Sequence, residues 1–396
     1  MVDVIRKGRT RDHTSAEPGS DSGWMLLIAV VALLCVIGLM MVLSASSVES
    51  LHSRGQAWFV FARQSLWVAL GAVALAGGAV VDYRHMRRVV RPLLGATFAL
   101  LLLVLVPGVG ITVSGSTRWL GTEAFRFQPS ELAKLAVLVF AADLLVRRVD
   151  QLDDARASLR PVLVVTGLVG ALILAQPDMG TAVVLVAAVL AVLFASGVSL
   201  GPMLVAGLGT IALAGVVGMG AGYRRARLMS FLRPFDDVGN SGYQVAQSLV
   251  ALGTGHLTGV GLGAGRAKWG FLPNAHTDFI FAILGEELGL LGTLLVVALF
   301  VAFTVLGVRT ALRAPDRFGC LLATGITAWV TGQALVNMGA VSGALPVTGV
   351  PLPFVSFGGS SLVVTMGAVG LLVNVSRQAA KPRPVASASA AVGGRR

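Results

Sequence analysis

The feature that most constrains this chain is a series of apolar runs, each about as long as a lipid bilayer is thick. Residues 24–43, 93–113 and 179–197 form three of these runs. A hydrocarbon core of about 30 Å needs about 20 apolar residues in a helix, and every backbone donor there must be paired within its own segment. Hydrophobic residues fill 55% of the 396 positions and charged residues 13%, against roughly 25% charged residues in soluble domains. The sequence therefore predicts an all-α, polytopic membrane protein.

The placement of apolar runs and charges predicts about ten transmembrane helices with both termini in the cytoplasm. The spans are expected to begin near Trp24, Leu66, Leu93, Glu131, Pro161, Asp178, Leu200, Asp278, Phe318 and Phe357. This arrangement places 20 of the 31 Lys and Arg residues in five inner segments, as cytoplasmic loops of membrane proteins prefer. We attribute the net charge of +12 to the basic residues that set the topology and to contact with anionic membrane lipids. We expect no nucleic-acid partner.

The domain organisation follows from the same pattern. Residues 1–23 are polar and form a cytoplasmic tail, 24–376 form the transmembrane domain, and 377–396 form a disordered cytoplasmic tail. A large external loop, residues 221–277, separates the seventh and eighth helices. The first apolar run has full spanning length, so it is expected to be a signal anchor and not a cleaved signal peptide. Cys35 and Cys320 lie in spans, which argues against a disulfide framework or a zinc site.

Ionisable residues at membrane depth indicate function, because each is costly unless it is paired or wet. One cluster contains Arg118, Trp119 and Arg126, followed by Glu131 and Lys134 at a helix start. A Glu131–Lys134 pair is feasible because residues three apart share a helix face, so a purely structural ion pair is an open alternative for Glu131. Three cations at one membrane boundary suit an anionic headgroup such as a diphosphate.

A second set of acidic residues stands at other helix starts on the external side. Asp178 follows a proline where an apolar run begins, and helix-dipole compensation would explain it equally well. Thr277 is expected to cap the eighth span, which would put Asp278 in its first turn at the membrane surface. Glu286 and Glu287 then lie deeper and cannot both face lipid, so protonation or pairing with a neighbouring helix is the structural alternative.

Two irregular segments accompany these acids. Alternating glycines from Gly253 to Gly265 precede Lys268 and suggest a flexible, close-packed loop, with backbone binding of phosphate as the alternative. Prolines at 346, 351 and 353 forbid a continuous helix. Irregular backbone at this depth is tolerated only where it lines a protein-walled or watery cavity. We therefore expect a re-entrant loop beside an active cavity.

Taken together, these motifs resemble the family of shape, elongation, division and sporulation proteins, which includes FtsW, RodA and SpoVE. The resemblance covers roughly residues 24–376, and the runs 43–47 and 276–289 look more like FtsW than RodA. It implies a peptidoglycan glycosyltransferase that polymerises lipid II, the undecaprenyl-diphosphate-linked disaccharide peptide, at the division septum of the bacterial inner membrane. The partners it implies are a class B penicillin-binding transpeptidase and other divisome membrane proteins.

The resemblance also implies roles for particular residues. Asp278 matches the essential external carboxylate and would act as general base for an inverting transfer, in which the GlcNAc 4-hydroxyl attacks the MurNAc anomeric carbon. Cations would stabilise the leaving diphosphate. The expected substrate-binding residues are Arg118, Trp119, Arg126, Glu131, Lys134, Asp178, Lys268, His276, Thr277 and Ser360, with Glu286 and Glu287 as supporting buried acids. No cofactor is required by this scheme. A divalent cation such as Mg²⁺ or Mn²⁺ would assist it, but Asp278 alone is a thin ligand set.

Two other functions fit parts of the pattern. A lipid II flippase would also show intramembrane acids and a proline-broken loop, although its polar groups would gather at the midplane and not on one face. A RodA-like polymerase serving cell elongation would use the same chemistry. A purely structural division scaffold leaves the buried ionisable residues unexplained.

Overall fold

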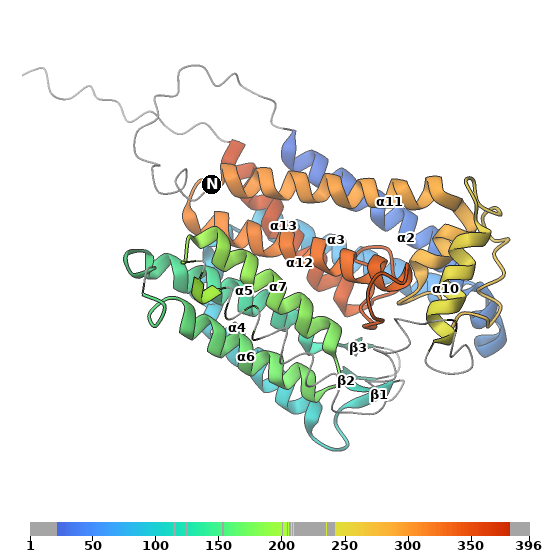
Figure 1. Cartoon of the computed structure of the whole chain (residues 1–396), viewed down its shortest axis with the longest axis horizontal. Helices are drawn as coiled ribbons and strands as arrows, with labels where there is room; N and C mark the ends of the chain where they lie inside the picture. Colours follow the sequence, from blue (N-terminus) through green and yellow to red (C-terminus); the bar gives the residue numbers. More distant parts are fainter. Residues whose placement is uncertain are drawn as a thin grey trace, which may run out of the picture.

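The protein is a bundle of long helices, shown by a computed structural model that describes residues 22–380 apart from 114–115, 123–124, 153 and most of 200–241 (Figure 1). The described α-helices are α2 (Gly23–Arg54), α3 (Phe59–Val80), α4 (Met86–Leu105), α5 (Pro129–Arg147), α6 (Leu159–Ala175), α7 (Met179–Ser196), α10 (Tyr243–Thr254), α11 (Ile280–Arg313), α12 (Arg317–Val341) and α13 (Ser360–Ala380). Two short 3₁₀ helices, η1 (Tyr83–His85) and η2 (Val149–Gln151), lie in connections.

Seven of the described helices are long and apolar enough to cross a membrane: α2, α3, α4, α7, α11, α12 and α13. Helix α6 is apolar but shorter, and α5 carries four charged side chains within its length, Glu131, Lys134, Asp143 and Arg147. These helices match nine of the ten expected spans, and the one expected near Leu200 lies mostly outside the described residues. Helices α3 and α4 each begin seven residues earlier than expected. Their first turns contain charged residues, such as Arg63 in α3 and Arg87 in α4, which precede the apolar run.

A small antiparallel sheet is the one departure from the expected all-α fold within the described residues. Strands β1 (Ile111–Val113), β2 (Ser116–Gly121) and β3 (Arg126–Phe127) pair in that order. The run 93–113 is therefore not one helix. Helix α4 ends at Leu105, and the chain passes Pro107, which lacks a backbone donor, and Gly108, which has φ +84°, before it enters β1. The sheet lies at one end of the bundle (Figure 1).

The alternating-glycine loop, residues 255–266, packs against a break in α11. Gly289 has φ +67° and interrupts the helix. The carbonyls of Glu286 and Glu287 accept hydrogen bonds from loop N–H groups instead of helical ones, at 3.0 and 3.1 Å. A Cβ at Gly259 would lie 2.1 Å from the Glu287 carbonyl oxygen, so only glycine allows this approach. The close-packed interpretation of the glycines is the one that the structure supports.

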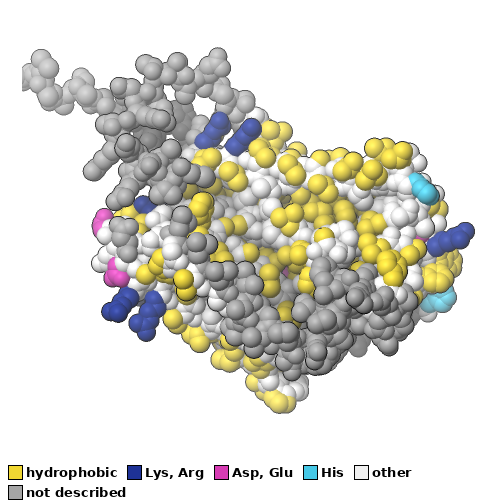
Figure 2. All heavy atoms as spheres, in the orientation of Figure 1, with side chains coloured by type: hydrophobic (Ala, Val, Ile, Leu, Met, Phe, Trp, Pro, Cys, Tyr) yellow, Lys and Arg dark blue, Asp and Glu magenta, His cyan; other side chains and the backbone are white. Residues whose placement is uncertain are grey.

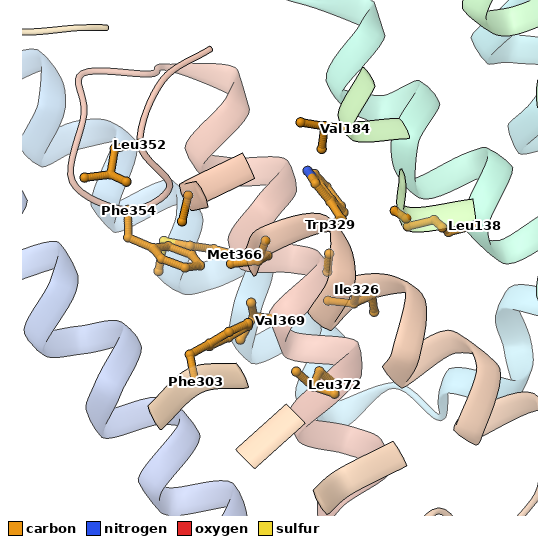
Figure 3. Close-up of a cluster of buried hydrophobic side chains, with 14 of the residues drawn as sticks. Leu138, Val184, Phe303, Ile326, Trp329, Leu352, Phe354, Met366, Val369 and Leu372 are labelled. Atoms are coloured by element: carbon orange, nitrogen blue, oxygen red, sulfur yellow. The ribbon is translucent and has the colours of Figure 1, made fainter. Parts of the chain in front are cut away.

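The core lies where α5, α7, α11, α12 and α13 meet around Trp329, which is fully buried (Figure 3). Phe354, from the loop at residues 342–359, packs against Phe303 of α11 with ring centroids 6.2 Å apart. This contact anchors the irregular loop in the bundle. On the face shown in Figure 2, most described charged side chains lie near the two ends of the helices, and hydrophobic ones lie between, as a membrane-spanning bundle requires.

Candidate active site

A cavity of about 470 Å³ opens at the end of the bundle that carries the sheet. Its walls come from the end of α2, the starts of α3, α5, α7 and α13, strands β1, β2 and β3, the segment before α11, and the 342–359 loop. Seven of the residues expected at the site line it: Arg118, Trp119, Arg126, Glu131, His276, Thr277 and Asp278. The expected re-entrant loop also lies beside it, through Thr348, Gly349 and Pro351.

The backbone that carries Asp278 is held by hydrogen bonds to three successive carbonyl groups. The Phe357 N–H donates to the His276 carbonyl at 3.0 Å, the Ser356 hydroxyl donates to the Thr277 carbonyl at 2.6 Å, and the Asn337 amide donates to the Asp278 carbonyl at 2.8 Å. All three donors come from α12 and the 342–359 loop. This segment is therefore pre-organised by elements that are distant in the sequence.

The start of α11 differs from the expectation. The helix begins at Ile280, and the residue at its N-terminal cap is Phe279. Thr277 does not cap it, because its hydroxyl donates to the Asn274 carbonyl at 3.2 Å. Asp278 consequently precedes the helix instead of lying in its first turn. Its half-buried carboxylate lies against Gly349, where an added Cβ would be 3.6 Å from Oδ2.

Arg118 and Arg126 are carried into the cavity by the sheet. Arg118 lies in β2 and Arg126 begins β3, paired with Gly121. Arg118 Nη1 is 3.8 Å from Asp178 Oδ1. The Nε atoms of both arginines are buried without a hydrogen-bond partner among the described residues. Buried donors of this kind usually find a partner, and an anionic ligand in the cavity would supply it.

Lys134 does not line the cavity, which corrects its expected place beside Arg126. Its ammonium group is buried, donates to Glu131 at 3.0 Å and to Gln333 Oε1 at 2.7 Å, and lies 4.7 Å from the Trp329 ring centroid. Two hydrogen bonds and one aromatic ring thus surround the ammonium group. The Glu131–Lys134 pair expected from their spacing is present, and Glu131 also accepts a hydrogen bond from Ser361 at 2.9 Å.

Asp178 and Ser360 lie behind the cavity wall and hold the segment that carries Arg126. Asp178 caps α7 by accepting from the Thr181 N–H at 3.2 Å and also accepts from Gln128 Nε2 at 2.8 Å. The Ser360 hydroxyl accepts from the Gln128 N–H at 3.0 Å. Asp178 thus caps α7 through Oδ1 and holds Gln128 through Oδ2, which agrees with the helix-start interpretation, and it does not itself line the cavity.

Lys268, Glu286 and Glu287 form a separate buried cluster and do not line the cavity. Lys268 Nζ lies 2.9 Å from Glu287 Oε1 and donates to the Ser44 hydroxyl at 3.0 Å. Glu286 accepts from the Arg266 N–H at 2.8 Å. The two acids thus fasten the glycine loop to α2 and α11, which is the pairing alternative stated above. Lys268 has no contact with the cavity that would make it a substrate ligand.

Two charged residues of the cavity wall are missing from the expected set. Glu49 lies near the end of α2, with its carboxylate 3.3 Å from His276 Nδ1. Arg63 lies in the first turns of α3, with its guanidinium 5.9 Å from the Phe357 ring centroid. The sequence did contain one indication of their role, because each is a charged residue at the external end of an expected span. Their neighbours in sequence form no motif, and only the fold brings them to Asp278.

The described residues contain no group of three or more His, Cys, Asp or Glu side chains that would hold a metal ion. What the arrangement can do is acid–base chemistry at Asp278 next to the positive charges of Arg63, Arg118 and Arg126.

Comparison with known proteins identifies relatives along nearly the whole chain. The model of the cell cycle protein family of FtsW, RodA and SpoVE matches residues 24–381. The chain is 44% identical to "Probable peptidoglycan glycosyltransferase FtsW" of Mycobacterium tuberculosis, over 98% of this chain and 76% of that protein. It is 42% identical to "Stage V sporulation protein E" of Bacillus subtilis, over 89% and 96%.

A solved structure has the same fold. It is described as "Structural coordination of polymerization and crosslinking by a peptidoglycan synthase complex", and one of its chains matches with a TM-score of 0.72 and 30% identity. The match covers 89% of this chain and 97% of that chain.

Proposed function

From the premise that this chain belongs to the FtsW, RodA and SpoVE family of cell cycle proteins, we propose that it is a peptidoglycan glycosyltransferase that polymerises lipid II. The observation that carries the proposal is one cavity at one end of a membrane-spanning bundle. Its wall combines the half-buried carboxylate of Asp278 with two arginines, Arg118 and Arg126, whose Nε donors have no hydrogen-bond partner among the described residues. Its volume is in the range of about 300–1,000 Å³ typical of small-molecule sites.

In the proposed mechanism, Asp278 removes the proton of the GlcNAc 4-hydroxyl as that oxygen attacks the MurNAc anomeric carbon of a second lipid-linked unit. The bond from that carbon to the diphosphate breaks, and the configuration inverts in a single displacement. A positioned general base contributes about 10²- to 10⁴-fold. Asn337 and Ser356 support the base, because their hydrogen bonds hold the backbone on either side of its Cα.

The leaving undecaprenyl diphosphate needs positive charge, and Arg118 and Arg126 supply it. Their placement on a sheet at the membrane boundary suits a headgroup whose lipid tail stays in the bilayer. Arginine binds phosphate oxygens through paired N–H donors, and each of these arginines has an Nε donor without a partner in the part of the chain that the structure describes. Lys134 contributes indirectly, by holding Glu131 in the wall.

The setting of this activity is part of the proposal. A relative named FtsW favours septal synthesis with a class B transpeptidase at the inner membrane, and the likeness to a chain of a peptidoglycan synthase complex agrees with such a partner. A RodA-like elongation role would use the same site. A lipid II flippase is the alternative from another class, but the cavity lies at one end of the bundle and not at its middle.

The decisive experiment compares lipid II affinity and polymerisation rate for the purified full chain with its transpeptidase. We expect Asp278→Asn to abolish glycan synthesis and leave lipid II binding intact or slightly tighter, because a negative charge near the diphosphate is removed. We expect Arg126→Ala to weaken binding about 10- to 100-fold, since a charge-assisted hydrogen bond contributes about 1.5 to 3 kcal/mol.

Arg266→Ala is the matched control, because Arg266 is exposed and does not line the cavity. Arg266→Ala should change neither the lipid II affinity nor the polymerisation rate. Full polymerisation by Asp278→Asn would overturn the assignment of the base. Loss of binding by Asp278→Asn in proportion to activity would make Asp278 a ligand contact instead.

A further inference from the structure

The end of the bundle opposite the cavity contains a second, strongly basic cleft. Helix α3 begins beside the cavity at Phe59 and ends at Val80, a distance of roughly 32 Å at 1.5 Å per residue, which is about the thickness of the hydrocarbon core. The next residues, η1 and the start of α4, form the cleft together with the end of α5. The cleft therefore lies at the other membrane boundary.

Five arginines and one valine line this cleft of about 600 Å³: Arg84, Arg87, Arg88, Val90, Arg91 and Arg147. Two of the guanidinium groups share one carboxylate, because Arg87 Nε and Arg147 Nε each lie 2.8 Å from a different oxygen of Asp143. Asp143 is only 5% exposed. Two arginines from different helices are thus held side by side by a buried acid, and none of their terminal nitrogens has a hydrogen bond to a described residue.

The positive charge of Arg84 is also balanced by carboxylates. Its Nε lies 2.7 Å from Asp316 Oδ2, and its Nη1 lies 3.4 Å from Asp82 Oδ2. Partial burial raises the pKa of Asp316, but hydrogen bonds from the Gly319 N–H, Tyr83 and Arg84 outweigh this effect and hold the pKa below its usual value. Asp316 is therefore ionised at neutral pH.

The remaining two arginines, Arg88 and Arg91, are exposed and have no carboxylate partner among the described residues. Three acids thus balance the charges of three of the five arginines, and two positive charges are left over. Both are on α4 and lie three residues apart, so they point to one side of the helix.

The same face of α4 continues toward the middle of the bundle as an exposed strip of small and apolar residues. Gly95, Ala99 and Leu102 follow Arg88 and Arg91 at intervals of three or four residues, and all are exposed. A Cβ at Gly95 would meet no atom within 4 Å, so the helix surface is open directly beside the arginines. A basic cleft joined to an open apolar strip is complementary to an anionic headgroup and the acyl chain attached to it.

We propose that this cleft binds the phosphate headgroup of an anionic phospholipid, with one acyl chain along the exposed face of α4 at residues 95–102. Arg88 and Arg91 bind the phosphate oxygens, and Arg87 and Arg147, held by Asp143, complete the basic wall. Excess arginine at one boundary also serves to orient a membrane protein. That role requires neither a buried carboxylate shared by two helices nor a gap at Gly95.

The test uses the purified full chain in detergent, with phosphatidylglycerol as the probe and phosphatidylcholine as the neutral reference. Bound lipids are counted by native mass spectrometry over a lipid titration. We expect wild type to prefer phosphatidylglycerol, and Arg88→Gln/Arg91→Gln to lose at least about 10-fold in affinity for it, because two charge-assisted contacts are removed. Affinity for phosphatidylcholine should not change.

Arg309→Gln/Arg313→Gln is the matched control, because it removes two exposed arginines from the last two turns of α11, outside the cleft. It should retain wild-type affinity. Equal losses in both double variants would show a general effect of charge and overturn the site.

Gly95→Leu separates a lipid from a free phosphate group. It should fold normally, since the added side chain meets open space, and it should weaken phosphatidylglycerol binding while leaving competition by glycerol 1-phosphate unchanged. Equal lipid affinity in Gly95→Leu and wild type would remove the acyl-chain part of the proposal. No phosphatidylglycerol preference in wild type would overturn all of it.

Discussion

Glu131 and Lys134 show how the surroundings of a residue decide its role. Both are at most 1% exposed, and the lysine is enclosed by Glu131, Gln333 and the Trp329 ring. A buried charge without its partner is costly, whereas the pair itself need not add stability relative to apolar residues. The pair therefore fixes the orientation of Glu131 in the cavity wall, and its geometry depends on both members.

We predict that Lys134→Met lowers the free energy of unfolding by about 3 to 5 kcal/mol, because it leaves the Glu131 carboxylate buried and unpaired. Thermal unfolding in detergent, followed by tryptophan fluorescence, measures this loss. The double variant Glu131→Gln/Lys134→Met should recover part of it. If Lys134→Met unfolds like wild type and loses only lipid II affinity, the lysine is a substrate ligand, as its sequence motif suggested.

The 342–359 loop connects α12 to α13 and acts as a frame for the catalytic segment. It is irregular because its prolines lack donors, and its Gly349 has φ +71°, a conformation that other residues rarely adopt. Asn337 of α12 joins loop and catalytic segment, since its amide donates to the carbonyls of both Asp278 and Val350 at 2.8 Å. The frame is thus built from hydrogen bonds to backbone carbonyls, such as those of Asp278 and Val350, that have no partner within a helix.

We predict that Asn337→Ala reduces kcat for polymerisation about 10- to 100-fold and changes KM little, because a displacement of about 1 Å in the base is enough for such a loss. Steady-state kinetics with labelled lipid II separates the two constants. Asn374→Ala is the control, since Asn374 is an equally buried asparagine that donates to the Ala79 carbonyl at the opposite end. Both variants should lose stability. A similar loss of kcat in both would deny Asn337 a positioning role.

The molecule as a whole has two different ends separated by one bilayer thickness. One end holds the sheet and α10 (Figure 1). The cavity lies at this end, and the arginine cleft lies at the other. The chain crosses between them with each long helix, so the end of α2 and the starts of α3, α5, α7 and α13 all meet at the cavity. A site that works on extracellular substrate requires this end to face outward.

We predict that the cavity end lies outside the cell and the arginine end in the cytoplasm. In a variant in which Cys35 and Cys320 are replaced by serine, Gln56→Cys in the exposed α2–α3 connection should react with a membrane-impermeant maleimide added to intact cells or spheroplasts. Arg156→Cys, exposed at the opposite end, should react only after lysis. The reverse pattern would refute the topology. Ser241, in the expected external loop, lies outside the described residues.

The amino-acid sequence by itself determined the class of the protein, nine described helices near their expected positions, and most of the charged cavity wall. The length of apolar runs, helix-start residues and the sidedness of charge are local properties, so they can be seen without a fold. The segments containing Arg126 and Asp278 could be recognised for this reason.

Tertiary structure alone decided which charges meet. Lys134 and Lys268 stand in motifs as strong as that of Arg126, yet each is paired with an acid. Lys134 pairs with Glu131 of its own helix, and Lys268 pairs with Glu287 of α11. Glu49 and Arg63 have no motif and still line the cavity. Helix α4 ends earlier than expected because Pro107 and Gly108 interrupt it. Helix α11 begins later than expected because the carbonyls of residues 276–278 accept hydrogen bonds from α12 and the 342–359 loop. Burial and pairing depend on contacts between distant segments, and these form only when the helices pack.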